Sequence, residues 1–469
     1  MQDCSRTNLT RRTVLSSPFL AAALLRAAQP ETVPVKVKRK PPDEWNVYQA
    51  RTVDGLPGFR PTEVARSRFG GRLDRKYRSP GFFRVRRIEG RWWLIDPEGC
   101  ASIHAGVGGM SPGRSPMAQA RVKEHFGAEQ GWAAETLKLL RAHDFNGTDG
   151  KALSEAAGQS PARLPYVLTS NFMGSFGRSK SMIVQLAGHL GYPGDCIPVF
   201  HPEFPAFCDT YAQALDATRD DPYLIGHFSD NELPTPVDLL DRSLALDLSN
   251  ANTNPGCQAA RSWLARRKGA AAADITDDDR EAFREFVYDR YFALTTAAIR
   301  KHDPNHLLLG SRFYGPTLTS PGVFAAAARH VDALSMNVYW QWTPEPNQLA
   351  MWSREAAKPF LVTEFYAKGD DAGMGNTSGA GWIVPTQSDR ALFYQHFTLA
   401  LLQSRQCIGW NWFKYIDNDP DDPTTDPSNR DSNKGIVNIH YAPYHDLLAG
   451  MRTLNRNLYA LADYFDRPL

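Results

Sequence analysis

The strongest constraint on the fold is an alternation, repeated along most of the chain, between short apolar segments and amphipathic helical patterns. Eight segments have the length and β-prone composition of strands: 101–107, 145–148, 166–169, 223–229, 307–311, 333–338, 360–363 and 408–412. Helical patterns separate several of them, at 135–143, 280–302, 323–330, 388–404 and 444–465. This order predicts an α/β fold, a closed parallel (β/α)8 TIM barrel. A doubly wound sheet is the alternative, but no dinucleotide-binding or phosphate-binding glycine motif stands at a strand-to-helix turn.

The start of the chain differs in character from the rest. Arg11 and Arg12 precede an apolar run over residues 14–25. This run is shorter than the ~20 residues that a membrane-spanning helix needs. It has the length of a signal-peptide core, and paired arginines before it are typical of the bacterial twin-arginine route. We therefore expect residues 1–30 to be an export signal peptide. An ordinary secretion signal or an uncleaved anchor is the alternative.

The exported protein is expected to be periplasmic or secreted, with no stable membrane insertion after processing. Residues 31–80 are rich in proline and basic residues, and we expect this N-terminal extension to wrap around the barrel rather than fold alone. Residues 81–469 are expected to form the barrel. A β-hairpin is predicted near its start, with Glu89 and Gly90 as the turn between two β-prone runs.

Two long connections follow predicted strands seven and eight, a glycine-rich segment at 366–387 and a polar, acidic segment at 417–434. The loops at the C-terminal ends of the strands build the active site in such barrels. The acidic run invites a calcium hypothesis, but it lacks the spacing of a known calcium loop and a solvated loop is favoured. The histidines have no metal-site spacing, so no metal and no cofactor is predicted. A disulfide between Cys196 and Cys208 is left open.

Two carboxylates follow apolar strands directly. Glu232 comes after the run 223–228, and Glu364 comes after 358–363, at the ends of predicted strands four and seven. A carboxylate beside a buried strand loses hydration, so it needs a partner or a function. Hydrolysis of a glycosidic bond requires two such groups, one to protonate the leaving oxygen and one to attack the sugar or activate water.

With these motifs the chain resembles the clan A retaining glycoside hydrolases, and among them the agarase-type β-galactan hydrolases. The resemblance covers about residues 80 to 450. The stretches that carry it are 92–99 (WWLIDPEG), 226–233 (GHFSDNEL), 303–313 (DPNHLLLGSRF), 359–365 (PFLVTEF) and 409–415 (GWNWFKY). One departure lies in strand two, where no aromatic residue follows Asn146.

The resemblance implies a role for each matching residue. Glu232 matches the acid/base, Glu364 the nucleophile, and Asn231 the ligand of the sugar 2-hydroxyl. Tyr339 matches the tyrosine that orients the nucleophile. Trp410 or Trp412 matches the tryptophan that forms a platform under the reacting sugar.

Four further residues are predicted to bind substrate from their places beside these segments: Arg312, Trp342, Asn337 and Lys414. For Arg312, which ends predicted strand five, contact with a carboxylate is the alternative. The implied function is hydrolysis of β-glycosidic bonds in a polysaccharide or oligosaccharide, for example an agarase-like galactan, by double displacement. A transglycosylase, a non-catalytic carbohydrate-binding barrel and a metal-dependent hydrolase are the alternatives. The formal net charge of +2 argues against a nucleic-acid partner.

Overall fold

The computed structural model describes residues 30–79, 81–158, 160–186, 189–269, 274–426 and 429–467. Apart from Pro30, the predicted export signal lies outside the described residues. Among the described residues, no helix has the length and apolar character needed to cross a bilayer. The division of the chain at residue 80 stays a prediction.

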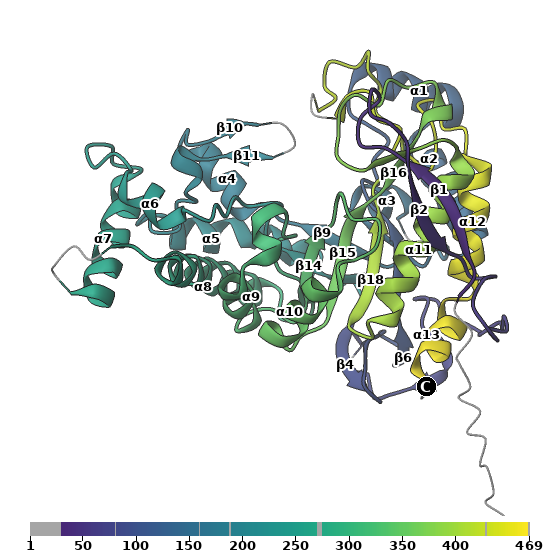
Figure 1. The fold of residues 1–469 in the computed structure, drawn as a ribbon, viewed down its shortest axis with the longest axis horizontal. Helices are drawn as coiled ribbons and strands as arrows, with labels where there is room; N and C mark the ends of the chain where they lie inside the picture. The colour runs from purple at the N-terminus through teal and green to yellow at the C-terminus, as the bar shows by residue number, and fades with distance from the viewer. Residues whose placement is uncertain are drawn as a thin grey trace, which may run out of the picture.

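Eight parallel strands form the centre of the molecule (Figure 1). In chain order they are β7 (His104–Val107), β8 (Gly147–Asp149), β9 (Tyr166–Thr169), β12 (Leu224–Phe228), β13 (Leu307–Leu308), β14 (Leu334–Asn337), β15 (Phe360–Phe365) and β18 (Cys407–Trp412). The first and last of these strands, β7 and β18, are neighbours in the sheet. A parallel bridge between Phe313 and Met336 joins the other two edges, with Phe313 N donating to Ser335 O at 2.8 Å. The sheet is therefore closed, and the predicted (β/α)8 barrel is confirmed.

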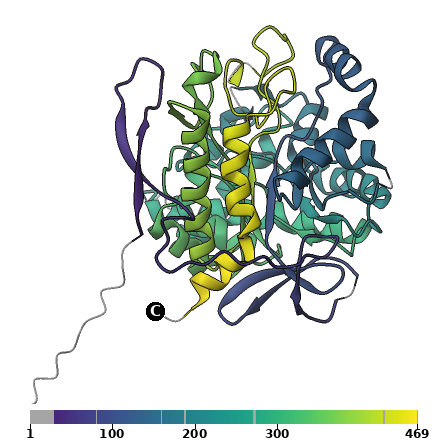
Figure 2. The ribbon, with the colours of Figure 1, turned by 90° about the vertical axis from the view of Figure 1, so that its right-hand side faces the viewer.

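Helices surround the barrel, and Figure 2 shows two of them, α11 and α12, side by side along its wall. The helices are α1 (Pro116–Phe126), α2 (Glu129–Ala142), α3 (Ala152–Ala157), α4 (Phe172–Ser179), α5 (Phe204–Ala212), α6 (Leu239–Leu244), α7 (Asn254–Lys268), α8 (Asp277–His302), α9 (Pro321–Ala328), α10 (Pro346–Ala356), α11 (Gln387–Gln403), α12 (His445–Arg456) and α13 (Leu458–Asp466). The helix predicted over 444–465 is two helices, because the backbone of Asn457 leaves the helical conformation between them.

Capping explains where the longest helix begins. The Thr276 side chain accepts from Asp279 N, and the Asp279 carboxylate accepts from Thr276 N, so the two residues form a capping box. Acidic residues in the first turn of α8 and basic residues in its last turn complement the helix dipole. These features fix where α8 begins and favour its helical conformation at both ends.

A small antiparallel sheet covers the N-terminal end of the barrel. Its strands are ordered β3 (Arg72–Lys76), β6 (Cys100–Ser102), β5 (Arg91–Ile95) and β4 (Arg84–Ile88). The predicted hairpin is confirmed, with Glu89 and Gly90 at φ 51° and 85° in the turn between β4 and β5. Side chains from this region pack against the barrel interior, and the shared cluster includes Phe69, Phe83, Leu94, Ile225, Leu361 and Ile408. One end of the barrel is thus closed by apolar packing.

Part of the N-terminal extension packs along the outside of the barrel. The hairpin of β1 (Thr32–Val37) and β2 (Asn46–Arg51) lies against α11. Trp342 Nε1 donates to Gln49 O at 2.9 Å, and the same ring stacks on His396. Lys38 pairs with Ile383 in β17 (Trp382–Val384), which itself pairs with β16 (Ala367–Gly369). The extension is therefore tied to the loop that follows strand seven.

Two smaller features complete the fold. A short hairpin pairs β10 (Val184–Gln185) with β11 (Leu190–Gly191). The five cysteines that the structure describes are all buried thiols, so the disulfide between Cys196 and Cys208 that was left open is not formed.

Replacing Trp342 with alanine should lower the free energy of unfolding by about 3–5 kcal/mol, because a large buried ring is lost and a cavity remains. The change should also loosen the β1–β2 hairpin, which limited proteolysis would detect near residues 30–56. Trp263→Ala, in α7, is the control, since that ring is only half-buried and packs on Phe283 of α8 instead of the extension. Equal destabilisation by the two variants would contradict this account of how the extension is held.

Candidate active site

The long loops at the C-terminal ends of the barrel strands enclose a cavity of about 610 Å³. Glu232, Tyr339, Glu364 and Phe413 reach it from the ends of four barrel strands. The loop after β18 supplies wall residues that include Ile416, Asp426 and Lys434, and Lys40 reaches the cavity from the N-terminal extension. Both predicted carboxylates therefore line one cavity.

Glu232 lies in an environment that favours its protonated form. Asn337 Nδ2 donates to Glu232 Oε1 at 2.7 Å and to Asn231 Oδ1 at 3.2 Å, so one amide orients both residues. Burial, assisted by the negative charge of Glu364, raises the pKa of Glu232 well above its usual range, and the Asn337 hydrogen bond offsets part of the rise. A carboxyl group with a raised pKa can donate a proton near neutral pH.

Glu364 lies in a different environment although it faces the same cavity. It is part of β15 and only 7% exposed. The Arg312 guanidinium forms an ion pair with its Oε1, and the Tyr339 hydroxyl donates to its Oε2. Both carboxylate oxygens are therefore held by donors, one of which carries a positive charge. The two carboxylates are thus suited to different tasks.

Arg312 connects several strands beneath the cavity. Besides Glu364, its Nη1 lies 3.4 Å from Asp149 Oδ2 and 3.5 Å from Thr169 Oγ1. The negative charge of Glu364 and of Asp149 raises the pKa of Arg312, although burial acts in the opposite direction. Of the two partners predicted for Arg312, substrate or a carboxylate, the structure shows the carboxylate. Arg312 pairs with Glu364 and is not among the residues that line the cavity.

The backbone turns sharply where these strands end. Glu232, Arg312 and Trp340 have φ values of 52°, 49° and 61°, a left-handed conformation that is uncommon for residues with a side chain. Each follows a different barrel strand, β12, β13 or β14. Backbone strain of this kind concentrates at functional sites, where the surrounding structure holds it in place.

The three tryptophans predicted to contact substrate do not line the cavity. Trp410 and Trp412 are fully buried, and their indole nitrogens donate to Tyr394 OH and Lys434 O. Asn411, between them, bonds to His104 of β7. Because side chains alternate along a strand, both tryptophans lie on the face opposite to Asn411. Trp342 packs under the N-terminal hairpin. The expected tryptophan platform is therefore not formed.

Other aromatic residues take the places expected for these tryptophans. Tyr314, Trp340, Tyr366 and Phe413 line the cavity. Phe413 directly follows Trp412, so the predicted segment does reach the cavity, one residue beyond the tryptophan. Of the other predicted residues, Asn231, Tyr339 and Lys414 line the cavity. Asn337 is not among the lining residues, but it donates hydrogen bonds to Asn231 and Glu232.

Two charged residues of the site were missed by the sequence analysis. Asp149 ends β8 and meets Arg312, and the rule that identified Glu232 and Glu364, a carboxylate at a strand end, would also have found it. Lys434 lies in a loop, where no periodic pattern indicates which side chains face the cavity.

The acidic segment after β18 uses its carboxylates to hold its own fold. Asp417 accepts hydrogen bonds from Lys434 N, Gly435 N and the Tyr444 hydroxyl, at 2.9, 2.7 and 2.6 Å. Asp419 forms an ion pair with Arg121 at 2.6 Å. These contacts shape the wall of the cavity and account for two of the carboxylates that had raised the calcium hypothesis.

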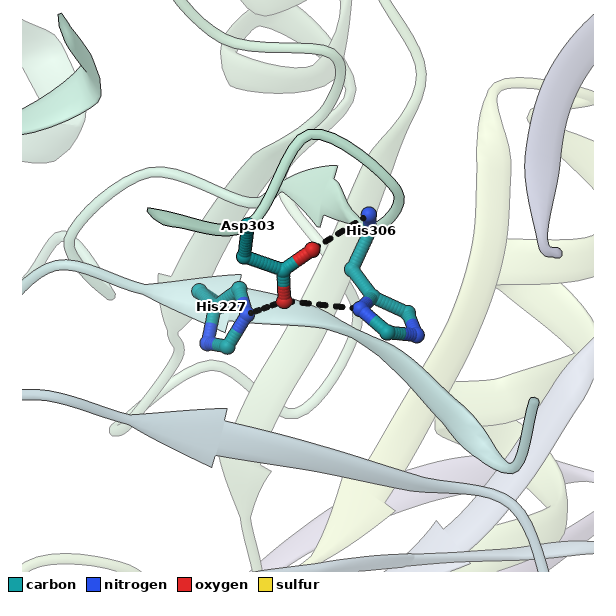
Figure 3. Close-up of side chains that lie close together, drawn as sticks. All are labelled: His227, Asp303 and His306. Carbon is teal, nitrogen blue, oxygen red and sulfur yellow. Dashed lines mark hydrogen bonds and ion pairs between the residues drawn. The ribbon is translucent and has the colours of Figure 1, made fainter. Parts of the chain in front are cut away.

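Away from the cavity, His227, Asp303 and His306 form a buried cluster (Figure 3). His227 Nε2 and His306 Nδ1 each lie 2.7 Å from Asp303 Oδ2. Ligand atoms around a tetrahedral zinc ion would lie roughly 3.3 Å apart, given bonds of about 2.0–2.1 Å. The short separations are those of hydrogen bonds, through which the cluster ties the end of α8 to β12.

Replacing Arg312 with methionine should lower the free energy of unfolding by about 3–5 kcal/mol, because Glu364 is left buried without its cation. Urea denaturation measures the change. Arg354→Met removes an exposed arginine from a surface pair with Glu355 and should change stability by no more than about 0.5 kcal/mol. Similar losses in the two variants would contradict the proposed importance of the buried ion pair.

Comparison with known proteins agrees with this geometry. No family model matches the chain. Beta-agarase B of Vibrio sp. (strain JT0107) is 24% identical over 499 residues, and beta-agarase A of the same strain is 27% identical over 410 residues. The alignment with beta-agarase B covers 84% of this chain but 50% of that protein, so the chain spans about half the length of this relative.

Solved structures match a large part of the chain. The structure of BpGH50 has a TM-score of 0.81 at 28% identity and covers 93% of this chain and 97% of its own. A solved exo-beta-agarase has a TM-score of 0.69 at 19% identity, covering 86% and 69%. The comparisons thus confirm what the sequence motifs indicated: the chain resembles the agarase-type glycoside hydrolases and shares their barrel.

Proposed function

We propose that this protein is a glycoside hydrolase that cleaves β-glycosidic bonds in a galactan and retains the configuration of the sugar. The observation that carries the proposal is the pair of carboxylates in one cavity, with Glu232 favoured in its protonated form and Glu364 paired with Arg312. Two carboxyl groups in such different environments are what this chemistry needs. The β-agarase names of the relatives support a galactan as the substrate class.

In the first step Glu364 attacks the anomeric carbon while Glu232 donates its proton to the leaving oxygen. Attack consumes the negative charge of Glu364, and Arg312 and Tyr339 keep its oxygens oriented until then. The C–O bond to the leaving sugar breaks as the bond to Glu364 forms. The product is a covalent glycosyl-enzyme.

In the second step Glu232, now ionised, removes a proton from water, and the oxygen of that water attacks the same carbon. Glu364 leaves as a carboxylate and Glu232 is protonated again. Neutralising Glu364 in the intermediate removes the charge that had helped to raise the pKa of Glu232, so Glu232 then functions as a base. The substrate is a polysaccharide or oligosaccharide, and a sugar in place of water would give transglycosylation. We also propose that the protein is exported, which rests on Arg11 and Arg12.

Glu364→Gln should abolish release of reducing ends from agarose, porphyran and carrageenan oligosaccharides, because the nucleophile is lost. Glu232→Gln should reduce kcat/KM by roughly 10²–10⁴, the usual contribution of a general acid. Glu135→Gln, on the exposed face of α2, is the control and should act like the wild type. NMR of the first anomer formed tests retention. Binding without cleavage by the wild-type protein would instead support the carbohydrate-binding alternative.

The pH dependence of kcat/KM provides a separate test. Glu232 must be protonated, so activity should be present below its raised pKa and fall as the pH rises through it. Asn337→Ala removes a hydrogen bond that lowers this pKa, so the alkaline limb should move to higher pH while kcat/KM falls. Asn347→Ala, on the exposed start of α10, should leave the profile unchanged. An alkaline limb that does not move in Asn337→Ala would contradict Glu232 as the acid.

A further inference from the structure

Two lysines share the wall of the cavity formed by the strand-eight loop. Lys414 N donates to Lys434 O at 3.0 Å, so the two residues are paired side by side, and both side chains line the cavity. Lys434 is 2% exposed, and its Nζ lies 5.0 Å from the ring centre of Phe413 and 5.5 Å from that of Tyr366. One buried and one half-buried lysine therefore reach the cavity that Glu364 also lines.

The nearby acids do not neutralise these lysines by contact. Asp417 is occupied by backbone amides and the Tyr444 hydroxyl, and Asp419 by Arg121. Asp426 and Glu364 attract both lysines only through longer-range electrostatics. Within the described residues, no hydrogen bond or ion pair joins either ammonium to a carboxylate.

Such an arrangement is costly without a ligand. A buried ammonium needs a counter-ion or hydrogen-bond partners to replace water. Burial lowers the pKa of Lys414 to about 8, and burial together with the charge of Lys414 lowers the pKa of Lys434. The ring faces of Tyr366 and Phe413 supply only a weak cation–π attraction. An anion placed between the lysines would satisfy both charges.

We propose that Lys414 and Lys434 form a subsite for an anionic substituent, a sulfate ester or a carboxylate, on the galactan sugar that binds against Glu364. This inference rests on the proposed function and narrows its substrate class to charged galactans. The ammonium groups donate hydrogen bonds to the oxygens of the substituent, and the aromatic rings beside them lie along the sugar. A neutral sugar leaves the two charges without a counter-ion.

The test compares matched oligosaccharides: neutral ones from agarose, sulfated ones from porphyran and carrageenan, and agarose oligosaccharides whose primary alcohols have been oxidised to carboxylates. The wild type should have a higher kcat/KM on one anionic series than on the neutral one. Lys434→Met and Lys414→Met should each lower kcat/KM on that series by roughly 10- to 100-fold, the worth of a charge-assisted hydrogen bond. Whichever series is preferred identifies the substituent.

Lys138→Met, which removes an exposed lysine from α2, is the control and should keep the preference. The anionic-to-neutral ratio is measured within each variant, so a partial loss of folded protein does not affect it. Cleavage of neutral oligosaccharides with no anionic preference, or a ratio unchanged in both lysine variants, would overturn the subsite and leave the proposed hydrolase intact. Failure to cleave any galactan would reject the proposed function itself.

Discussion

Closure of eight parallel strands into one ring is the constraint on which the rest of this structure depends. Parallel strands all end at the same rim, so residues distant in the sequence come together there. Arg312, for example, contacts both Asp149 and Glu364. The other end is closed by the small sheet of β3 to β6 and its apolar contacts. The polar chemistry is thereby confined to one rim, where the loops are long enough to enclose it.

At that rim the two glutamates have different partners. Arg312 holds Glu364 from beneath, whereas Glu232 is held by an uncharged amide, that of Asn337. The same cavity therefore contains one carboxylate paired with a cation and one without. Lys414 and Lys434 add positive charge on the side of the strand-eight loop. The pKa values of Glu232, Arg312, Lys414 and Lys434 all depend on charged neighbours in the site, so these groups are electrostatically coupled.

Much of the fold and part of the site could be predicted from the sequence, because the periodicity of a strand or helix is visible within a few neighbouring residues. The eight strand segments and the two carboxylates at strand ends follow from apolar runs and what comes after them. The tryptophan platform failed because the register of β18 decides which residues face inward, and Trp410 and Trp412, two residues apart, both lie on the other face. Had alternation been applied from Asn411, it would have directed Trp410 and Trp412 outward. Lys434 could not be found, because a loop has no period and its contacts are set by distant residues.

The left-handed backbone at Glu232, Arg312 and Trp340 limits how this protein could be made more heat-resistant. Each such residue costs about 1–2 kcal/mol relative to an ordinary conformation, and glycine would remove the cost. Glycine would also remove the proton donor, the cation that holds the nucleophile or an aromatic wall of the cavity. An engineer must therefore seek thermal tolerance elsewhere, for example in helix caps or surface charge. The left-handed backbone at these three positions therefore has to stay, whatever is changed in the rest of the barrel.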